Sequence, residues 1–141
     1  MTPRHLSDRV AVAPQIAPAD VTQLKAAGFA LVINNRPDGE EPGQPTGAVI
    51  AEAAARAGLA YRAIPIASGF GEADVAEMAT ALAGAAGPVL AFCRSGTRST
   101  FLWALAEARG GGDPAAIARA AAAAGYDIAP IRAAVERLAR G

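Results

Sequence analysis

Cysteine, histidine and aromatic residues are scarce in this sequence. Cys93 is the only cysteine, His5 is the only histidine, and aromatic residues make up 5% of the 141 residues. A single cysteine cannot form a disulfide within the chain, and nothing in the sequence suggests that His5 meets Cys93 as a catalytic partner. No cluster of histidine, cysteine and aspartate has the spacing of metal ligands, so we expect no metal and no cofactor.

Charge of one sign and long apolar runs are missing as well. The 13 basic and 13 acidic residues cancel, and no block of like charge stands out. Nucleic acid and membrane surfaces are therefore not expected as partners. The first ten residues lack the apolar stretch of a signal peptide, and no run is long enough to span a bilayer. We expect a cytoplasmic protein.

Short apolar runs alternate along the chain with segments of helical character. The runs are four to six residues long, which is typical of strands buried in a parallel sheet, and they predict strands at 10–13, 29–34, 60–64 and 88–93. Apolar spacing, capping residues, glycine and proline predict helices at 18–27, 47–57, 72–86, 97–109, from 114 onward and at 127–138.

This order of elements predicts an α/β fold in one domain, residues 1–141. Strand–helix–strand units of this length form parallel pairs with right-handed crossovers. We expect a small, mainly parallel sheet of four to five strands flanked by helices. Ligands of such sheets bind beyond the carboxyl ends of the strands, where the segments 35–41, 65–70 and 93–98 leave the sheet.

The segment Cys93-Arg94-Ser95-Gly96-Thr97-Arg98 has the features of an anion-binding loop. It joins a buried strand to a helix, so its backbone amides and the helix terminus are available to an anion. Gly96 permits a tight turn, and Arg98 offers a planar fork of donors. The same features favour the thiolate form of a cysteine, which is the nucleophile. We expect an anion to be bound by Arg94, Ser95, Gly96, Thr97, Arg98, Ser99 and Arg36.

An ordinary buried cysteine at the end of a strand is the alternative to a reactive one. Two arginines and several hydroxyl residues around a glycine are unusual at a purely structural strand end. The sequence therefore favours a nucleophilic Cys93, with Arg98 as its catalytic partner.

The loop resembles the six-residue active loop of rhodanese-type sulfurtransferases. The chain as a whole is similar to the beta-lactamase-hydrolase-like phosphatase domain, a bacterial family related to dual-specificity phosphatases and also labelled a sulfur transferase. The similarity rests on two segments, 33–40 and 92–99, that read INNRPDGE and FCRSGTRS. The resemblance implies a protein-tyrosine-phosphatase-like fold with Cys93 and Arg98 in the anion loop.

Two features depart from the phosphatase pattern. Phosphatases of this type have five residues between the cysteine and the arginine, whereas four separate Cys93 from Arg98. The aspartate that protonates the leaving group should lie within 65–70, which has no carboxylate. Asp38 or Glu40 is a possible replacement acid, and we include Asp38 among the catalytic candidates.

These departures favour sulfur transfer, because sulfite leaves thiosulfate without protonation. We expect a rhodanese-like sulfurtransferase that forms a persulfide on Cys93 from thiosulfate or a small persulfide. The first alternative is a tyrosine- or dual-specificity-type phosphatase with a phosphocysteine intermediate, and the second is a non-catalytic anion- or persulfide-binding domain. The expected partners are a small anionic sulfur or phosphate substrate, and a second copy of the chain or an enzyme of sulfide and persulfide metabolism.

Overall fold

The computed structural model describes residues 1–141, which form a five-stranded sheet in the order β1-β2-β5-β3-β4. β1 is antiparallel to β2, and the other neighbouring strands are parallel. The strands are β1 (Arg4–His5), β2 (Val10–Ala13), β3 (Leu31–Asn34), β4 (Ala60–Ala63) and β5 (Val89–Phe92). The predicted mainly parallel sheet is therefore confirmed.

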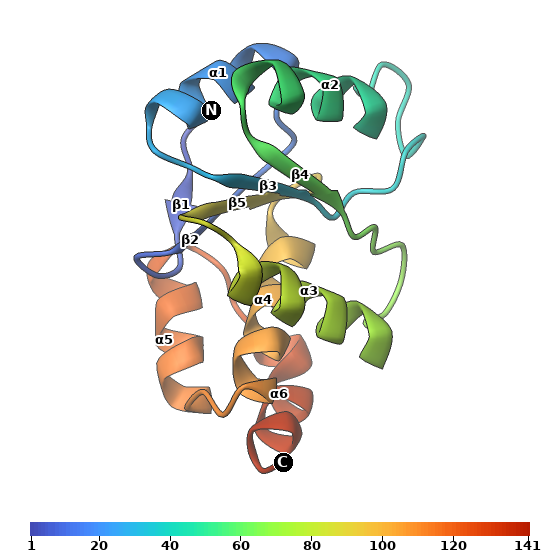
Figure 1. Ribbon diagram of the computed structural model, residues 1–141. Helices are drawn as coiled ribbons and strands as arrows, with labels where there is room; N and C mark the ends of the chain where they lie inside the picture. Colours follow the sequence, from blue (N-terminus) through green and yellow to red (C-terminus); the bar gives the residue numbers. More distant parts are fainter.

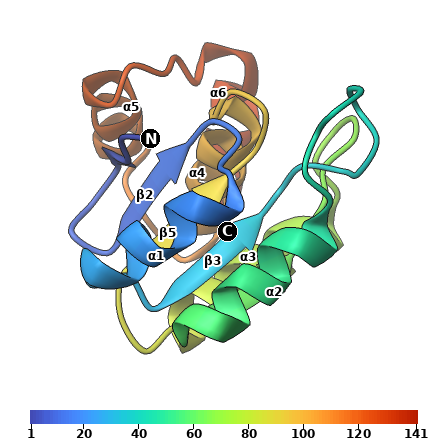
Figure 2. The same cartoon turned by 90° about the horizontal axis from the view of Figure 1, so that it is seen from above.

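Helices cover both faces of this sheet (Figure 1). They are α1 (Pro18–Ala26), α2 (Gly47–Ala57), α3 (Glu72–Gly84), α4 (Thr97–Arg109), α5 (Pro114–Ala123) and α6 (Arg132–Ala139), with a short 3₁₀ helix at Ala129–Ile131. Helices α1 and α2 lie on one face, and α3 to α6 lie on the other, as the two views at right angles show (Figures 1 and 2). None of these helices is long and apolar enough to cross a membrane.

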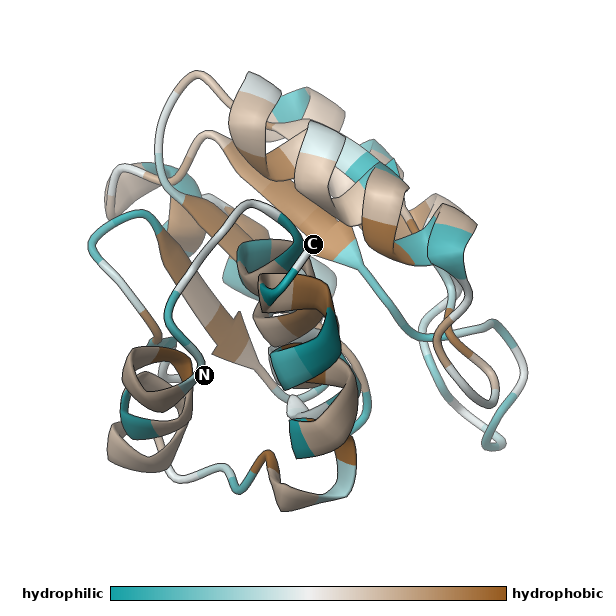
Figure 3. Cartoon of the chain, turned by 90° about the horizontal axis from the view of Figure 1, so that it is seen from below, coloured by the Kyte–Doolittle hydropathy of each residue, from teal (hydrophilic) through white to brown (hydrophobic).

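The apolar runs of the strands explain their central position. β5 pairs with both β2 and β3, and all four of its residues are buried. Alternate residues face opposite sides of a strand, so β5 contributes to two cores. Val89 and Ala91 join a cluster under α3 to α6, while Leu90 and Phe92 join a smaller cluster under α1 and α2. The hydropathy colouring of Figure 3 shows apolar strands between helices whose polar residues lie outward.

Local signals set several helix boundaries. The Thr46 side chain accepts a hydrogen bond from the Val49 amide at 3.3 Å, and the left-handed Gly58 ends α2. Asp113 caps α5 in the same way through the Ala116 amide at 3.0 Å. The predicted helix at 127–138 begins instead as a 3₁₀ turn and becomes α-helical at residue 132.

The carboxyl ends of three parallel strands bring the predicted loops together. The amide of Asn35 donates to the carbonyl of Phe92 at 2.8 Å, and the amide of Ile66 donates to the carbonyl of Asn35 at 2.9 Å. Figure 2 shows the segments after β3 and β4 extending side by side beyond the sheet. The segments 35–41 and 65–70 therefore meet the Cys93 loop at one edge of the sheet.

Candidate active site

The Cys93 loop begins where β5 ends and closes at the first turn of α4. Cys93 is fully buried, and its sulfur accepts a hydrogen bond from the Gly96 amide at 3.1 Å. Gly96 has φ +92° and ψ −9°, a left-handed conformation that residues with a side chain rarely adopt. This turn folds the backbone around the sulfur and directs the amino end of α4 toward it.

The carbonyl groups of the loop are bound by donors elsewhere in the fold. The Arg94 carbonyl accepts from the Gln15 amide at 3.2 Å, and the Gly96 carbonyl accepts from both the amide and the hydroxyl of Thr100, at 2.9 and 2.8 Å. The Ser95 carbonyl accepts from the Tyr126 hydroxyl at 3.0 Å. The negative ends of these peptides are thus occupied by protein donors.

Most amide groups of the loop remain free. The backbone amides of Arg94, Ser95, Arg98 and Ser99 make no hydrogen bond to any group of the chain. Unpaired amides gathered at the start of a helix bind oxyanions, and a phosphate or sulfate group offers enough oxygens for several of them. The predicted anion loop therefore has its donors in place.

Arg98 is fixed with one edge of its guanidinium unused. Nη1 and Nη2 donate to the two carboxylate oxygens of Glu40 at 2.8 and 2.9 Å, and Nη1 also donates to the Ile66 carbonyl at 2.7 Å. Nε makes no hydrogen bond and Nη2 keeps one free N–H, so the side-on fork of the guanidinium is available to two oxygens. The hydrogen bond to Glu40 is the main cause of the raised pKa of Arg98, and an interaction with Cys93 adds to it, which indicates that the Arg98 and Cys93 side chains are neighbours.

Glu40 is an anion held between two arginines. The hydrogen bond from Arg98 lowers the pKa of Glu40 to about 2, with a further contribution from Arg36, whose Nε donates at 2.9 Å. The hydrogen bond to Glu40 in turn raises the pKa of Arg98, which therefore stays charged. A carboxylate with so low a pKa has no proton to give near neutral pH, so this arrangement gives no support for Glu40 as the replacement acid.

Arg36 supports the loop through hydrogen bonds and does not present a free guanidinium edge to an anion. Its three guanidinium nitrogens donate to Glu40, to Glu41 at 2.6 Å and to the Gln15 side chain at 3.0 Å. Burial alone would lower the pKa of Arg36, but the hydrogen bonds to the two glutamates outweigh it and raise the pKa. The geometry thus gives Arg36 a supporting role, where we had expected an anion ligand.

Asp38 lies on the expected loop but is directed to α2. Its Oδ1 accepts from the Gly47 amide at 2.8 Å, at the first residue of that helix. Near 65–70, Asp74 likewise accepts from the Gly71 amide at 2.9 Å at the start of α3. Both carboxylates have the helix-capping role typical of such positions, and the geometry gives no support for Asp38 as a catalytic acid.

The remaining loop residues divide into buried and exposed ones. Ser99 is buried, and its hydroxyl donates to Asn35 Oδ1 at 2.8 Å, so its single proton is not available to the anion that we expected it to bind. Arg94 is exposed and pairs with Glu41 at 3.3 Å. Ser95 and Thr97 share a hydrogen bond between their hydroxyls at 3.0 Å.

Sequence reasoning missed three parts of this site. Gln15 and Asn35 support Arg36 and Ser99, and Tyr126 reaches the loop from the turn after α5. Asn35 had a usable signal, because it directly follows a strand whose carboxyl end faces the loop. No sequence signal pointed to Tyr126, because its approach to the loop depends on how the segment after α4 folds back over that helix.

Glu40 provides a direct test of how Arg98 is positioned. We expect Glu40→Gln to lower kcat/KM for an aryl phosphate by about tenfold, because the replacement loses a charge-assisted, two-point hold on the guanidinium. The reduction should be the same factor across neutral and alkaline pH, since Glu40, with a pKa of about 2, stays ionised there. pH–rate profiles of both proteins measure this.

Glu52→Gln is the matched control, because Glu52 forms one exposed ion pair with Arg56 on α2. That substitution should leave the rate unchanged. Loss of only the alkaline limb of the Glu40→Gln profile would show instead that Glu40 delivers a proton.

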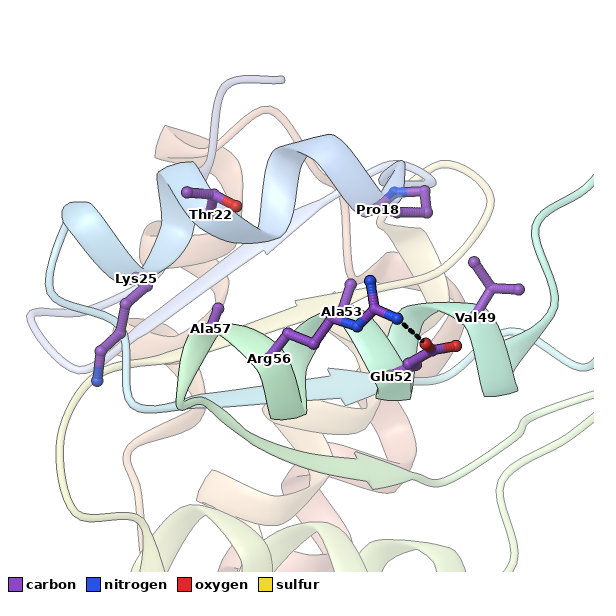
Figure 4. Close-up of a pocket in the computed structure, with 8 residues that line it drawn as sticks. All are labelled: Pro18, Thr22, Lys25, Val49, Glu52, Ala53, Arg56 and Ala57. Atoms are coloured by element: carbon purple, nitrogen blue, oxygen red, sulfur yellow. Dashed lines mark hydrogen bonds and ion pairs between the residues drawn. The ribbon is translucent and has the colours of Figure 1, made fainter.

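The cavity between α1 and α2 differs in chemistry from the Cys93 loop. It has a volume of about 470 Å³, and Figure 4 shows Arg56 paired with Glu52 in its wall. Lys25, also in the wall, donates to the Gly58 carbonyl at 3.3 Å. No nucleophilic thiol lines it, so it is not the candidate active site.

Comparison with known families agrees with this geometry. Residues 3–110 match the model of the phosphatase-like domain of beta-lactamase hydrolase-like proteins. The chain belongs to this family. Its residues are 43% identical over 108 positions to a beta-lactamase hydrolase-like protein of Agrobacterium fabrum, covering 76% of the chain and 25% of that protein. The family member described here thus spans about a quarter of the curated relatives that it matches.

Solved structures of other proteins are also similar to this chain. A candidate phosphatase from Neisseria meningitidis is 32% identical, covers 95% of this chain and 96% of its own, and has a TM-score of 0.83. A variant of Pseudomonas aeruginosa TpbA in complex with phosphotyrosine is 18% identical, with a TM-score of 0.64 and coverage of 96% and 80% of the two chains. At 18% identity the similarity to TpbA shows the fold alone. That fold is the phosphatase-like fold expected from the sequence.

The sulfurtransferase interpretation is wrong. The matched family is phosphatase-like, and the Neisseria meningitidis structure, at 32% identity, is described as a candidate phosphatase. Loop length misled the inference, because sulfate-like and phosphate-like groups are both tetrahedral oxyanions that amides and an arginine fork hold equally well. The expected persulfide donor and the partner enzyme of sulfide metabolism lose their support with it.

Proposed function

We propose that this chain is a cysteine-dependent phosphatase that hydrolyses phosphate monoesters through a phosphocysteine intermediate. One observation carries the proposal: the loop that begins at Cys93 has unpaired backbone amides, its Gly96 amide donates to the sulfur, and Arg98 keeps a free guanidinium edge. The family supports a phosphatase-like activity, and phosphotyrosine, which is bound in the structure of the TpbA variant, is such a monoester.

In the first step the Cys93 thiolate attacks phosphorus. An S–P bond forms, the bond from phosphorus to the ester oxygen breaks, and the ester oxygen leaves with that electron pair as a phenoxide or alkoxide. The free amides and the unused edge of Arg98 stabilise the charge on the phosphoryl oxygens. Because Cys93 is fully buried, neighbouring side chains must shift before a phosphoryl group reaches the sulfur.

In the second step water attacks the phosphocysteine. The S–P bond breaks, the thiolate is restored, and inorganic phosphate leaves with the oxygen of the water. The only histidine, His5, stacks on Phe29 and has no part in these steps. The reaction needs neither oxidant nor reductant.

The carboxylates of the site determine which esters react best. Glu40 is ionised, Asp38 and Asp74 cap helices, and 65–70 has no acidic residue. The leaving oxygen therefore departs without a side-chain acid. A phenolate leaves more easily than an alkoxide, so aryl phosphates should be the better substrates.

Steady-state hydrolysis of an aryl phosphate and an alkyl phosphate tests the proposal. We expect turnover of the aryl ester and a kcat/KM about a hundredfold lower for the alkyl ester, which is the usual contribution of a general acid. Inorganic phosphate should inhibit both reactions competitively.

Binding of inorganic phosphate without turnover of either ester would contradict the proposal and identify a non-catalytic anion-binding domain. Equal kcat/KM values on the two esters would instead reveal an acid that the geometry does not assign.

A further inference from the structure

The peptide between Ser95 and Gly96 is held on both sides. Its N–H, on Gly96, donates to the Cys93 sulfur at 3.1 Å. Its carbonyl, on Ser95, accepts from the Tyr126 hydroxyl at 3.0 Å and from no other donor of the chain. The thiol and Tyr126 therefore bind opposite ends of one peptide plane.

Nothing else in the loop fixes this plane so directly. Glycine adopts positive and negative φ with similar ease, so Gly96 permits its present conformation without enforcing it. If the plane turned over, the carbonyl oxygen would approach the sulfur in place of the N–H and would repel a thiolate or a phosphoryl oxygen. The neighbouring carbonyls of Arg94 and Gly96 are held by backbone amides, whereas that of Ser95 depends on one side chain.

The position of Tyr126 is fixed by the packing around it. It is 8% exposed, follows Gly125 in the turn after α5, and packs in the core beneath α4. The guanidinium carbon of Arg4 lies 5.4 Å from the centre of its ring. A side chain at Gly96 would collide with the Tyr126 hydroxyl, which shows how closely the two residues approach. Burial raises the pKa of Tyr126, so its hydroxyl keeps the proton that it donates.

We propose that Tyr126 is a positioning residue of the active site: its hydroxyl holds the Ser95–Gly96 peptide with the N–H toward Cys93. The catalytic part of this inference rests on the proposed phosphatase function, whereas its structural part concerns anion binding alone. Residue 126 lies outside the family match, which ends at residue 110, so the segment after α4 supplies a component of the site.

The test compares Tyr126→Phe with Tyr61→Phe. Tyr61 is the only other tyrosine, is partly buried, and accepts a hydrogen bond from Asn34 Nδ2 at 3.0 Å, so its variant also loses one hydroxyl contact. Three readouts are needed: the affinity for inorganic phosphate, the rate at which iodoacetamide alkylates Cys93 at neutral pH, and kcat on an aryl phosphate. Thermal unfolding of both variants reports any general loss of stability.

We expect Tyr126→Phe to bind phosphate about tenfold more weakly and to react more slowly with iodoacetamide, with kcat reduced by a similar factor. The amide signal of Gly96 in a ¹H–¹⁵N spectrum should shift. Tyr61→Phe should match the parent protein in phosphate affinity, alkylation rate, kcat and the Gly96 amide signal. Unchanged phosphate affinity and alkylation in Tyr126→Phe would overturn the inference, whatever the melting temperature. If the parent protein shows no turnover, affinity and alkylation still decide the role of Tyr126.

Discussion

Cys93→Ser should abolish hydrolysis of an aryl phosphate, lowering kcat by about four orders of magnitude or more. A serine hydroxyl is a poor nucleophile unless a base removes its proton, and no histidine or free carboxylate adjoins this position. The amides of the loop do not depend on the sulfur for their orientation, apart from the one on Gly96. Binding of inorganic phosphate should therefore persist in the variant.

Phosphate binding separates loss of the nucleophile from loss of the loop. Isothermal titration with inorganic phosphate measures it, and the melting temperature confirms that the variant is folded. A Cys93→Ser protein that still turned over the ester would exclude the covalent mechanism.

Arg98→Lys should lower kcat/KM by about a hundredfold or more, although the positive charge remains. Lysine is a point charge without the planar fork, so it cannot bind Glu40 at two points and also present a second edge to a phosphoryl group. Steady-state kinetics on the aryl ester measure the reduction.

Arg56→Lys is the matched control, because Arg56 also pairs with a glutamate but lies on α2. It should behave like the parent protein. An Arg98→Lys variant with parental kinetics would mean that charge alone holds the substrate and that the guanidinium geometry is irrelevant.

Much of the fold was predictable because local sequence signals set the bounds of many strands and helices. The strand 10–13 and the helix 97–109 have the predicted bounds, since apolar runs and glycines mark both. The edge strand β1 was missed, because a strand of two residues has no periodic pattern. It is recognised only by its antiparallel pairing with β2. The final helix begins late because Pro130, which has no N–H, lies in the preceding turn.

The part of the candidate site that lies on one continuous segment was predictable, and the part that is assembled from distant segments was not. Cys93, Gly96 and Arg98 lie together because one strand–loop–helix segment carries them, and their roles in the reaction stay predictions. The choice among acidic residues was not predictable: Asp38 and Glu40 share a loop, but backbone geometry directs one to Gly47 and the other to Arg98. The type of group transferred could not be read from the loop, because its donors recognise tetrahedral oxyanions in general.

A phosphocysteine on Cys93 is the central claim, and rapid acid quenching of the reaction with an aryl phosphate tests it most directly. Mass spectrometry of the peptide that contains Cys93 should show the added mass of one phosphoryl group during turnover. The same peptide from the Cys93→Ser protein should show no such addition. Turnover with an unmodified Cys93 peptide at every quench time would contradict the account, because hydrolysis would then proceed by direct attack of water.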